Sequence, residues 1–410
     1  MLKIDGDVPA AIVLGDSLTT LATVRGLARA GIPVYAATTA EDAPTRYSRR
    51  CRTLNRPRDP APSADALAWL IDFCAGLKHQ PVVIPTSDED ALWLAQNAFA
   101  LRPWCRFSIA SYESMLRIVS KDGLYAAARR AGVPVVPSIV EPSAADVTAW
   151  SLVHPGPYLL KPFYDQIARC KLRDKNLLVD DRGALLRYVA REGTRALIIQ
   201  RKLNGGDGAI LDAYGLCSVK GVPLTMASHR RLRQYPPDFG STCYGEIPMG
   251  GSRELETKLF DFTRRLLSEV GYHGIFGIEW LHETATDELY VIDFNARPFL
   301  SIGHLIDSGL NLPLLAYLEL IGHDLDDVRP LPVLKHLLWM NVLRDSRTLR
   351  QRRNITLMAW LGSILRCRSF AVWDRVDPGP WLHQSALTLR EQWRKYSRHQ
   401  ESNQRFRPSE

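Results

Sequence analysis

The first hundred residues alternate short apolar strands with amphipathic helices, and this alternation limits the possible folds more than any other feature. Residues 11–14 are an apolar tetrapeptide, 15–17 supply a glycine turn and a serine cap, and 18–30 have helical periodicity. A helix over 65–77 then leads to a strand at 81–85. Strands joined through helices run parallel, so we expect a doubly wound α/β sheet. The three-glycine phosphate fingerprint is absent, which favours a scaffold with a substrate edge.

After a proline-rich hinge at 132–137 the pattern changes. Strands are predicted at 158–162, 196–200, 209–216 and 223–228, followed by a helix over 254–270 and two further strands. Strands interrupted by loops rather than by helices indicate α+β architecture. The chain therefore combines an α/β part with an α+β part.

Composition excludes several classes of protein. The 410 residues are 46% hydrophobic and 23% charged, which excludes a wholly disordered or fibrous chain. No apolar run approaches the roughly 18 residues that span a bilayer, and the start turns acidic before any apolar stretch, unlike a secretion signal. The seven cysteines are scattered without a CxxC pair, which argues against a disulfide frame or a zinc site. We therefore expect a cytoplasmic protein.

The net charge of +8 is concentrated at one end of the chain. Residues 344–410 hold fourteen Lys and Arg against six Asp and Glu, so the remainder is close to neutral. The same region carries Leu357, Trp360, Leu361, Ile364 and Leu365 at helical spacing beside arginines. We favour packing of this apolar stripe on the body of the protein. An anionic membrane surface or another anionic macromolecule is the alternative partner of this basic tail.

Residues 275–297 carry the strongest chemical signal. Two strand-like segments, 275–280 and 289–295, are separated by a polar turn; a pivot at Thr286 places Glu279 directly opposite Asp293. Strand periodicity puts Asp293, Asn295 and Arg297 on one face and points Ile292 to the other. Two facing carboxylates and a carboxamide suit Mg²⁺. The alternative is a solvent-exposed polar face with an Arg–Asp ion pair.

Upstream residues could bind a phosphate or a nucleotide. Lys161 ends the strand at 158–162 and Lys121 opens a helix, where a compact cation fits a phosphate as a point charge. Gln200 ends another strand before a glycine-rich bend that contains Asp207. Taken separately, surface lysines and a plain flexible loop are the ordinary interpretations.

These motifs, in this order, resemble the ATP-grasp superfamily, in particular its carboxylate–amine ligases such as D-aspartate ligase, D-alanine–D-alanine ligase and biotin carboxylase. The resemblance covers about residues 1–325, and its most specific part is Ile278-Glu279-Trp280 followed by Asp293-Phe294-Asn295-Ala296-Arg297-Pro298. It implies a Rossmann-like pre-ATP-grasp domain at 1–115, a two-lobed ATP-grasp domain at 116–325 and a basic helical extension at 326–410.

The resemblance also implies roles for individual residues. It makes Glu279, Asp293 and Asn295 ligands of Mg²⁺, or of Mn²⁺. It places Arg297 at the transferred phosphoryl group or the substrate carboxylate, and Arg231 near the position of the family's third phosphate-binding cation. It also implies a set of residues that bind ATP. In this set Gln200 replaces the usual glutamate that contacts adenine, and Asp207 binds the ribose. The full nucleotide set is Lys121, Lys161, Gln200, Lys202, Leu203 and Asp207.

The implied activity is ATP-dependent ligation of a small-molecule carboxylate to an amine or thiol through an acylphosphate, with a homodimer as one possible assembly. The chain departs from the family after Lys161, because residues 164–178 lack the glycine-rich loop that covers the phosphates and carry Arg169, Lys171, Arg173 and Lys175 instead. Two alternatives therefore stay open. One is an ATP-grasp modifier of a peptide or other macromolecule docked by the basic tail, and the other is a catalytically silent ATP-binding protein.

Overall fold

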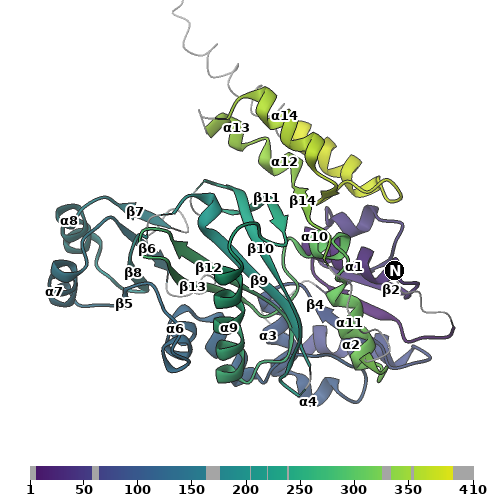
Figure 1. The fold of residues 1–410 in the computed structure, drawn as a ribbon. Coiled ribbons are helices and arrows are strands. Elements are labelled where there is room, and N and C mark those ends of the chain that lie inside the picture. The colour runs from purple at the N-terminus through teal and green to yellow at the C-terminus, as the bar shows by residue number, and fades with distance from the viewer. Residues whose placement is uncertain are drawn as a thin grey trace, which may run out of the picture.

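The computed structural model describes residues 6–57, 64–162, 176–203, 205–218, 220–237, 240–325, 334–351 and 355–390. Three sheets organise these residues (Figure 1). Within the described ranges, no helix combines the length and the hydropathy that a membrane span requires.

The N-terminal sheet is parallel throughout, as the alternation of strands and helices predicted. Its strands are β1 (Ala11–Leu14), β2 (Val34–Thr38), β3 (Arg52–Asn55) and β4 (Val82–Pro85), in the order β3-β2-β1-β4. Ser17 caps the first helix, because its hydroxyl accepts the backbone N–H of Thr19. The helices of this part are α1 (Leu18–Ala28), α2 (Ala64–Ala75), α3 (Asp88–Gln96), α4 (Ala98–Leu101) and α5 (Tyr112–Val119), with a 3₁₀ turn η1 (Pro44–Tyr47).

A small antiparallel sheet follows the hinge. It has the order β5-β8-β6-β7 and is reached through α6 (Lys121–Arg130). Apolar side chains of α7 (Ala144–Val153) and α8 (Arg182–Glu192) form a core with this sheet. Its strands are β5 (Ser138–Val140), β6 (Tyr158–Pro162), β7 (Leu177–Val179) and β8 (Leu197–Arg201).

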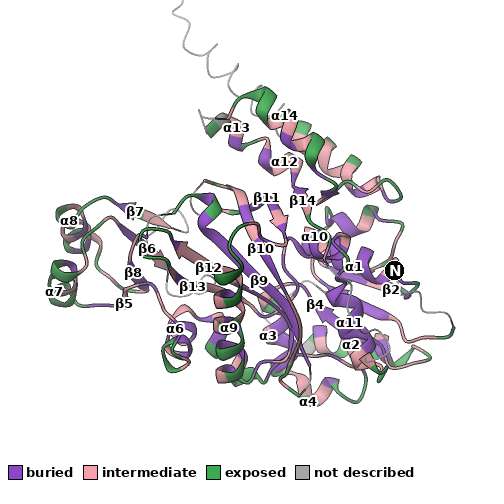
Figure 2. Cartoon of the chain, in the orientation of Figure 1, coloured by how far each residue is buried: buried purple, intermediate pink, exposed green. Residues whose placement is uncertain are grey.

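The largest sheet has seven strands in the order β13-β12-β9-β10-β11-β14-β15. Figure 2 shows β9 buried near the centre of the molecule and β10 partly buried beside it. β10 runs seven residues past its predicted end at 228, through a basic stretch that the apolar pattern did not indicate. The strands are β9 (Ile210–Cys217), β10 (Pro223–Tyr235), β11 (Ser241–Ile247), β12 (Gly274–Glu283), β13 (Glu288–Asn295), β14 (Leu337–Met340) and β15 (Ser369–Phe370); η2 (Asp207–Ala209) precedes β9, and α9 (Arg253–Val270), α10 (Ile302–Asp307) and α11 (Leu312–Leu320) complete this part.

The basic C-terminal region is not purely helical, contrary to the prediction. β14 pairs with β11 and β15 pairs with β14, so residues after 334 extend the large sheet. The helices α12 (Val342–Asp345), α13 (Thr348–Gln351) and α14 (Leu357–Arg366) lie at one end of the molecule (Figure 1). The prediction that the apolar stripe of α14 packs on the body is only half right. Ile364 packs inward beside Tyr244 and Met340, whereas Leu357, Leu361 and Leu365 are exposed.

Candidate active site

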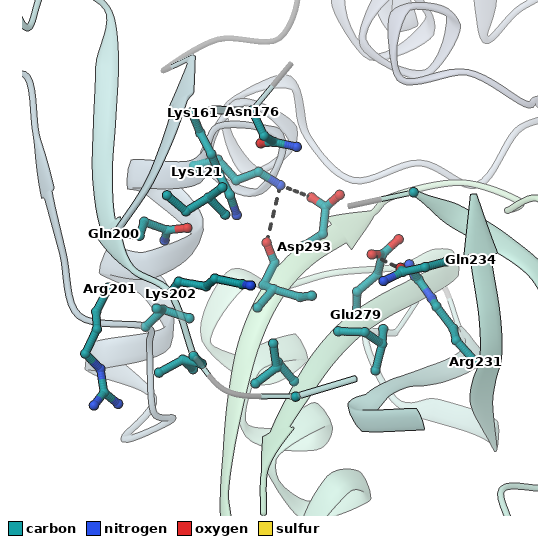
Figure 3. Close-up of a pocket in the computed structure, with 18 of the residues that line it drawn as sticks. Lys121, Lys161, Asn176, Gln200, Arg201, Lys202, Arg231, Gln234, Glu279 and Asp293 are labelled. Atoms are coloured by element: carbon teal, nitrogen blue, oxygen red, sulfur yellow. Dashed lines mark hydrogen bonds and ion pairs between the residues drawn. The ribbon is translucent and has the colours of Figure 1, made fainter. Parts of the chain in front are cut away.

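A cavity of about 310 Å³ lies between the small sheet and the large sheet. Cationic, carboxylate and amide side chains share its wall with apolar ones, and Figure 3 shows the polar groups pointing toward one another. Eight of the predicted site residues line it: Lys121, Lys161, Gln200, Lys202, Leu203, Arg231 and, on the β12–β13 hairpin, Glu279 and Asp293. Asn176, Arg201 and Gln234 also line it and were not predicted.

The β12–β13 hairpin places Glu279 directly opposite Asp293, as predicted. The turn itself is centred half a residue earlier than Thr286, since Glu283 pairs with Glu288. A bulge at Ile292 then shifts the register by one residue and brings Glu279 and Asp293 into line. The prediction that Ile292 points away from Asp293 is wrong, because a bulge breaks the alternation of faces and both residues line the cavity.

A different cation contacts each of the two facing carboxylates. Lys121, in the first turn of α6, pairs with Asp293 and donates to the carbonyl of Ile292 at 3.3 Å (Figure 3). The α6 N-terminus is fixed by Ser120, whose hydroxyl accepts the Gly123 backbone N–H. On the other side of the hairpin, Arg231 of β10 lies 2.7 Å from a Glu279 oxygen.

Asp212 anchors Arg231 and was missed by the sequence reading. Its buried carboxylate accepts two hydrogen bonds from the Arg231 guanidinium, at 2.7 and 3.2 Å, and lies 2.6 Å from Nδ1 of His229. β9 lies beside β12, so Asp212 is also the register partner of Glu279. Three carboxylates, Asp293, Glu279 and Asp212, are therefore register partners on three adjacent strands, and Arg231 contacts two of them, Glu279 and Asp212.

The pKa values of the two facing carboxyl groups are shifted in opposite directions. Burial raises the pKa of Glu279, and the negative charges of Asp293 and Asp212 add to this rise against the lowering effect of Arg231. Burial also acts on Asp293, but the charge and hydrogen bond of Lys121 outweigh it, and the pKa of Asp293 is lowered. Burial opposes the charged form of Lys121 as well, yet Asp293 holds the Lys121 pKa above its usual value.

A Mg²⁺ ion fits this donor set by its chemistry. Asn295 donates from Nδ2 to Glu279 at 3.3 Å and to the Gly277 carbonyl at 3.3 Å, which leaves its carbonyl oxygen for another partner. Within the described residues, no group of three or more His, Cys, Asp or Glu is placed to hold a metal. The candidate set contains two carboxylates and one carboxamide, so phosphate oxygens and water would have to complete an octahedral shell.

The opposite end of the cavity offers an amide with a defined orientation. Gln200 is buried at the end of β8 and donates from Nε2 to the Tyr125 hydroxyl at 2.9 Å. Tyr125 lies one helical turn after Lys121 on α6, a spacing that could have indicated this contact. The Gln200 carbonyl oxygen is then the acceptor available at the cavity. The apolar part of the cavity wall includes Leu159, Leu203, Ile210 and Ile292.

Three predicted site residues do not line the cavity. Arg297 forms two 2.9 Å hydrogen bonds with Asp88, in the first turn of α3, at the carboxyl end of the first sheet. Asp207 is buried and accepts the Gln234 backbone N–H at 3.2 Å, so the structure gives no contact to support its predicted ribose role. Asn295 contacts the cavity residue Glu279 through a hydrogen bond but is not itself part of the cavity wall. The basic loop residues 169, 171, 173 and 175 lie outside the described part of the chain.

A parallel α/β sheet followed by two antiparallel sheets that enclose a polar cavity is the arrangement of the ATP-grasp fold. N5-carboxyaminoimidazole synthetase from Staphylococcus aureus superposes with a TM-score of 0.62 at 16% identity, over 86% of this chain and 88% of that chain. L-amino acid ligase from Bacillus licheniformis gives 0.62 at 15%, over 82% and 80%. Biotin carboxylase from Campylobacter jejuni gives 0.60 at 14%, over 80% and 74%.

Neither a protein-family model nor a curated protein matches the sequence. The predicted resemblance to the ATP-grasp superfamily is therefore confirmed through the fold.

Proposed function

We propose that this chain is an ATP-dependent ligase that joins a carboxylate to an amine. The observation that carries the proposal is the pair of facing carboxylates, Glu279 and Asp293, at a cavity that also holds Lys121, Lys161 and Arg231. Structural neighbours include complexes with ADP and with a Mg·ADP salt, and their titles name synthetases, ligases and carboxylases. These neighbours support the same general chemistry here.

The residues suggest how a nucleotide would lie. Gln200 and the apolar wall around Leu203 suit an adenine ring, because the amide oxygen can accept from the ring's amino group. Lys121, Lys161, Lys202 and Arg231 would neutralise the phosphates as charge moves on transfer. Mg²⁺ bound by Glu279, Asp293 and Asn295 would neutralise negative charge on the transferred phosphoryl group.

The reaction balances as two displacements. A carboxylate oxygen of the substrate attacks the γ-phosphorus and ADP leaves, which gives an acylphosphate. The amine nitrogen then attacks the acyl carbon, phosphate leaves, and the amine loses a proton. We assign the carboxylate substrate to the side of Arg297, whose guanidinium would exchange Asp88 for a substrate carboxylate in the same bidentate geometry. The site requires no protein nucleophile.

Calorimetric titration of Mg·ATP tests the site before any substrate is known. We expect wild type to bind, and both Glu279→Gln and Asp293→Asn to bind at least tenfold more weakly or to lose the dependence on Mg²⁺. Asp287→Asn is the matched control, since Asp287 lies in the turn of the same hairpin and is largely exposed. Substrates would follow from a screen of carboxylate and amine mixtures for ADP release.

A folded wild-type protein that does not bind Mg·ATP would contradict the proposal, as would variants that bind like wild type. Binding without ADP release from any mixture would favour the catalytically silent alternative.

A further inference from the structure

The C-terminal segment, residues 334–390, turns its acidic side chains inward. It contains ten Lys and Arg but only three acids, all aspartates. Every one of these aspartates pairs with an arginine of the preceding part of the chain: Asp345 with Arg233, Asp374 with Arg29 and Asp377 with Arg25. No acid of the segment is therefore left to balance its own cations.

Five of the segment's cations face solvent instead. None of these exposed cations has a carboxylate partner within the described residues; they are Lys335, Arg366, Arg368, Arg375 and Arg390. Because the aspartates pair inward and these basic side chains face solvent, the exposed charges of the segment are positive. A surface of this kind attracts an anionic partner.

One face of α14 adds exposed apolar side chains to this cationic surface. Leu357, Met358, Leu361 and Leu365 are 60%, 76%, 41% and 77% exposed. At 3.6 residues per turn they fall within an arc of about 100°. Trp360 and Ser363 lie on the opposite side, where Trp360 donates to Asp345 and Ser363 is buried. Arg366 is exposed in the last turn of α14, about 80° beyond the edge of this arc, and Figure 2 shows exposed positions along α14.

We propose that α14 docks on an anionic lipid surface, with this apolar face in the headgroup region and the flanking arginines on lipid phosphates. Two independent features favour lipid. A polyanion would be bound by the cations alone and would gain nothing from four exposed Leu and Met side chains, whereas a lipid interface buries them. A second copy of this chain would bring like-charged surfaces together. The docking is peripheral and does not depend on the proposed ligase activity.

Vesicle co-sedimentation of the full chain tests this docking. We expect wild type to bind vesicles with roughly 30% phosphatidylglycerol at least tenfold more tightly than pure phosphatidylcholine. Leu361→Gln/Leu365→Gln should weaken this binding at least tenfold, and so should Arg366→Gln/Arg368→Gln. The matched control is Leu152→Gln/Val153→Gln, which removes two equally exposed apolar side chains of α7, 67% and 72% exposed, and should bind as wild type.

Three results would overturn the proposal. Wild type that does not bind anionic vesicles is one. Vesicle binding that survives the leucine changes, together with equally tight binding to heparin, would identify a polyanion surface. A dimer in light scattering that dissociates in Leu361→Gln/Leu365→Gln would identify α14 as an interface between copies. Circular dichroism of each variant distinguishes these results from unfolding, which is not expected because all six substituted side chains are exposed.

Discussion

Glu279 and Asp293 lie directly opposite each other on the β12–β13 hairpin, yet the pKa of Glu279 is raised and that of Asp293 is lowered. Burial opposes the ionised form of both carboxyl groups, and the cations that counteract it are shared unequally. Lys121 pairs with Asp293 alone, whereas Arg231 is shared between Glu279 and Asp212. Glu279 thus carries negative charge that the ligand-free protein compensates incompletely.

Removing these two charges should change stability in opposite directions. A raised carboxyl pKa means that ionised Glu279 lowers stability once the pH exceeds its folded pKa. Glu279→Gln should therefore keep or raise the ligand-free unfolding midpoint at neutral pH, by about 1–3 °C. Asp293→Asn leaves Lys121 without its partner and should lower the midpoint by about 1–3 °C, a small effect because the Asp293 side chain is 41% exposed and screened.

Differential scanning calorimetry at pH 7 measures both midpoints. Mg·ATP should raise the wild-type midpoint but neither variant's to the same degree. A fall for Glu279→Gln as large as that for Asp293→Asn would show that Arg231 fully compensates Glu279.

Tyr125 should control nucleotide affinity without touching the nucleotide. Tyr125→Phe removes the acceptor of Gln200 Nε2 and leaves a buried amide donor unpaired, which frees the amide to turn. We expect ATP affinity to fall about fivefold to tenfold, equivalent to roughly 1 kcal/mol.

The control for Tyr125 is Tyr158→Phe in the same small lobe. The Tyr158 hydroxyl donates to the His154 carbonyl at 2.9 Å and not to a cavity residue. Its loss should lower stability while ATP affinity, measured by calorimetry, stays unchanged. Equal affinity losses in both variants would mean that the lobe, and not the Gln200 orientation, determines binding.

Local sequence patterns predicted much of this site. The remaining residues could not be predicted, because their positions depend on strand pairing between distant parts of the sequence. The β12 and β13 strands could be predicted because the turn between them is short. The predicted pairing of Glu279 with Asp293 is correct because the bulge at Ile292 cancels the half-residue error in the centre of the turn. Asp212 could not be found this way. It is the register partner of Glu279 only because β9 lies next to β12, although the two strands are distant in sequence. The periodicity of residues within either strand does not indicate which strand pairs with it.

The fold shows the same division. The parallel sheet was predicted correctly from the alternation of apolar strands and amphipathic helices. β14 and β15 were missed, since short strands at the edge of a sheet are defined by the neighbour to which they hydrogen-bond. The spacing of α14 likewise predicted an amphipathic helix but not how much of its stripe faces solvent.

His304 should make stability depend on pH. Burial lowers its pKa well below 6.5, and His229 adds to this shift; the imidazole donates from Nε2 to the Leu337 carbonyl at 2.9 Å. The unfolded chain therefore binds a proton that the folded chain excludes as pH falls below about 6.5. Stability is complete above that pH and declines below it, by about 1.4 kcal/mol per pH unit for this one group.

His304→Gln keeps a donor for Leu337 and removes the titration. Denaturant unfolding between about pH 5 and pH 6.5 should show a slope reduced by one proton relative to wild type. His323→Gln is the control, because His323 is exposed. An unchanged slope in His304→Gln would mean that His304 is protonated in the folded protein.

Asp345 should be essential for holding the C-terminal segment on the large sheet. Its fully buried carboxylate accepts two hydrogen bonds from Arg233, at 3.0 and 2.7 Å, and one from Trp360 at 2.9 Å. Asp345→Asn leaves the Arg233 charge buried and unpaired, so the unfolding free energy should fall by about 3–5 kcal/mol. Denaturant unfolding followed by tryptophan fluorescence measures this loss. Arg233→Gln/Asp345→Asn should lose less than the sum of the single changes, because no charge is then left buried. Additive losses would show that the two side chains act independently, and α12 would then be held by its apolar contacts alone.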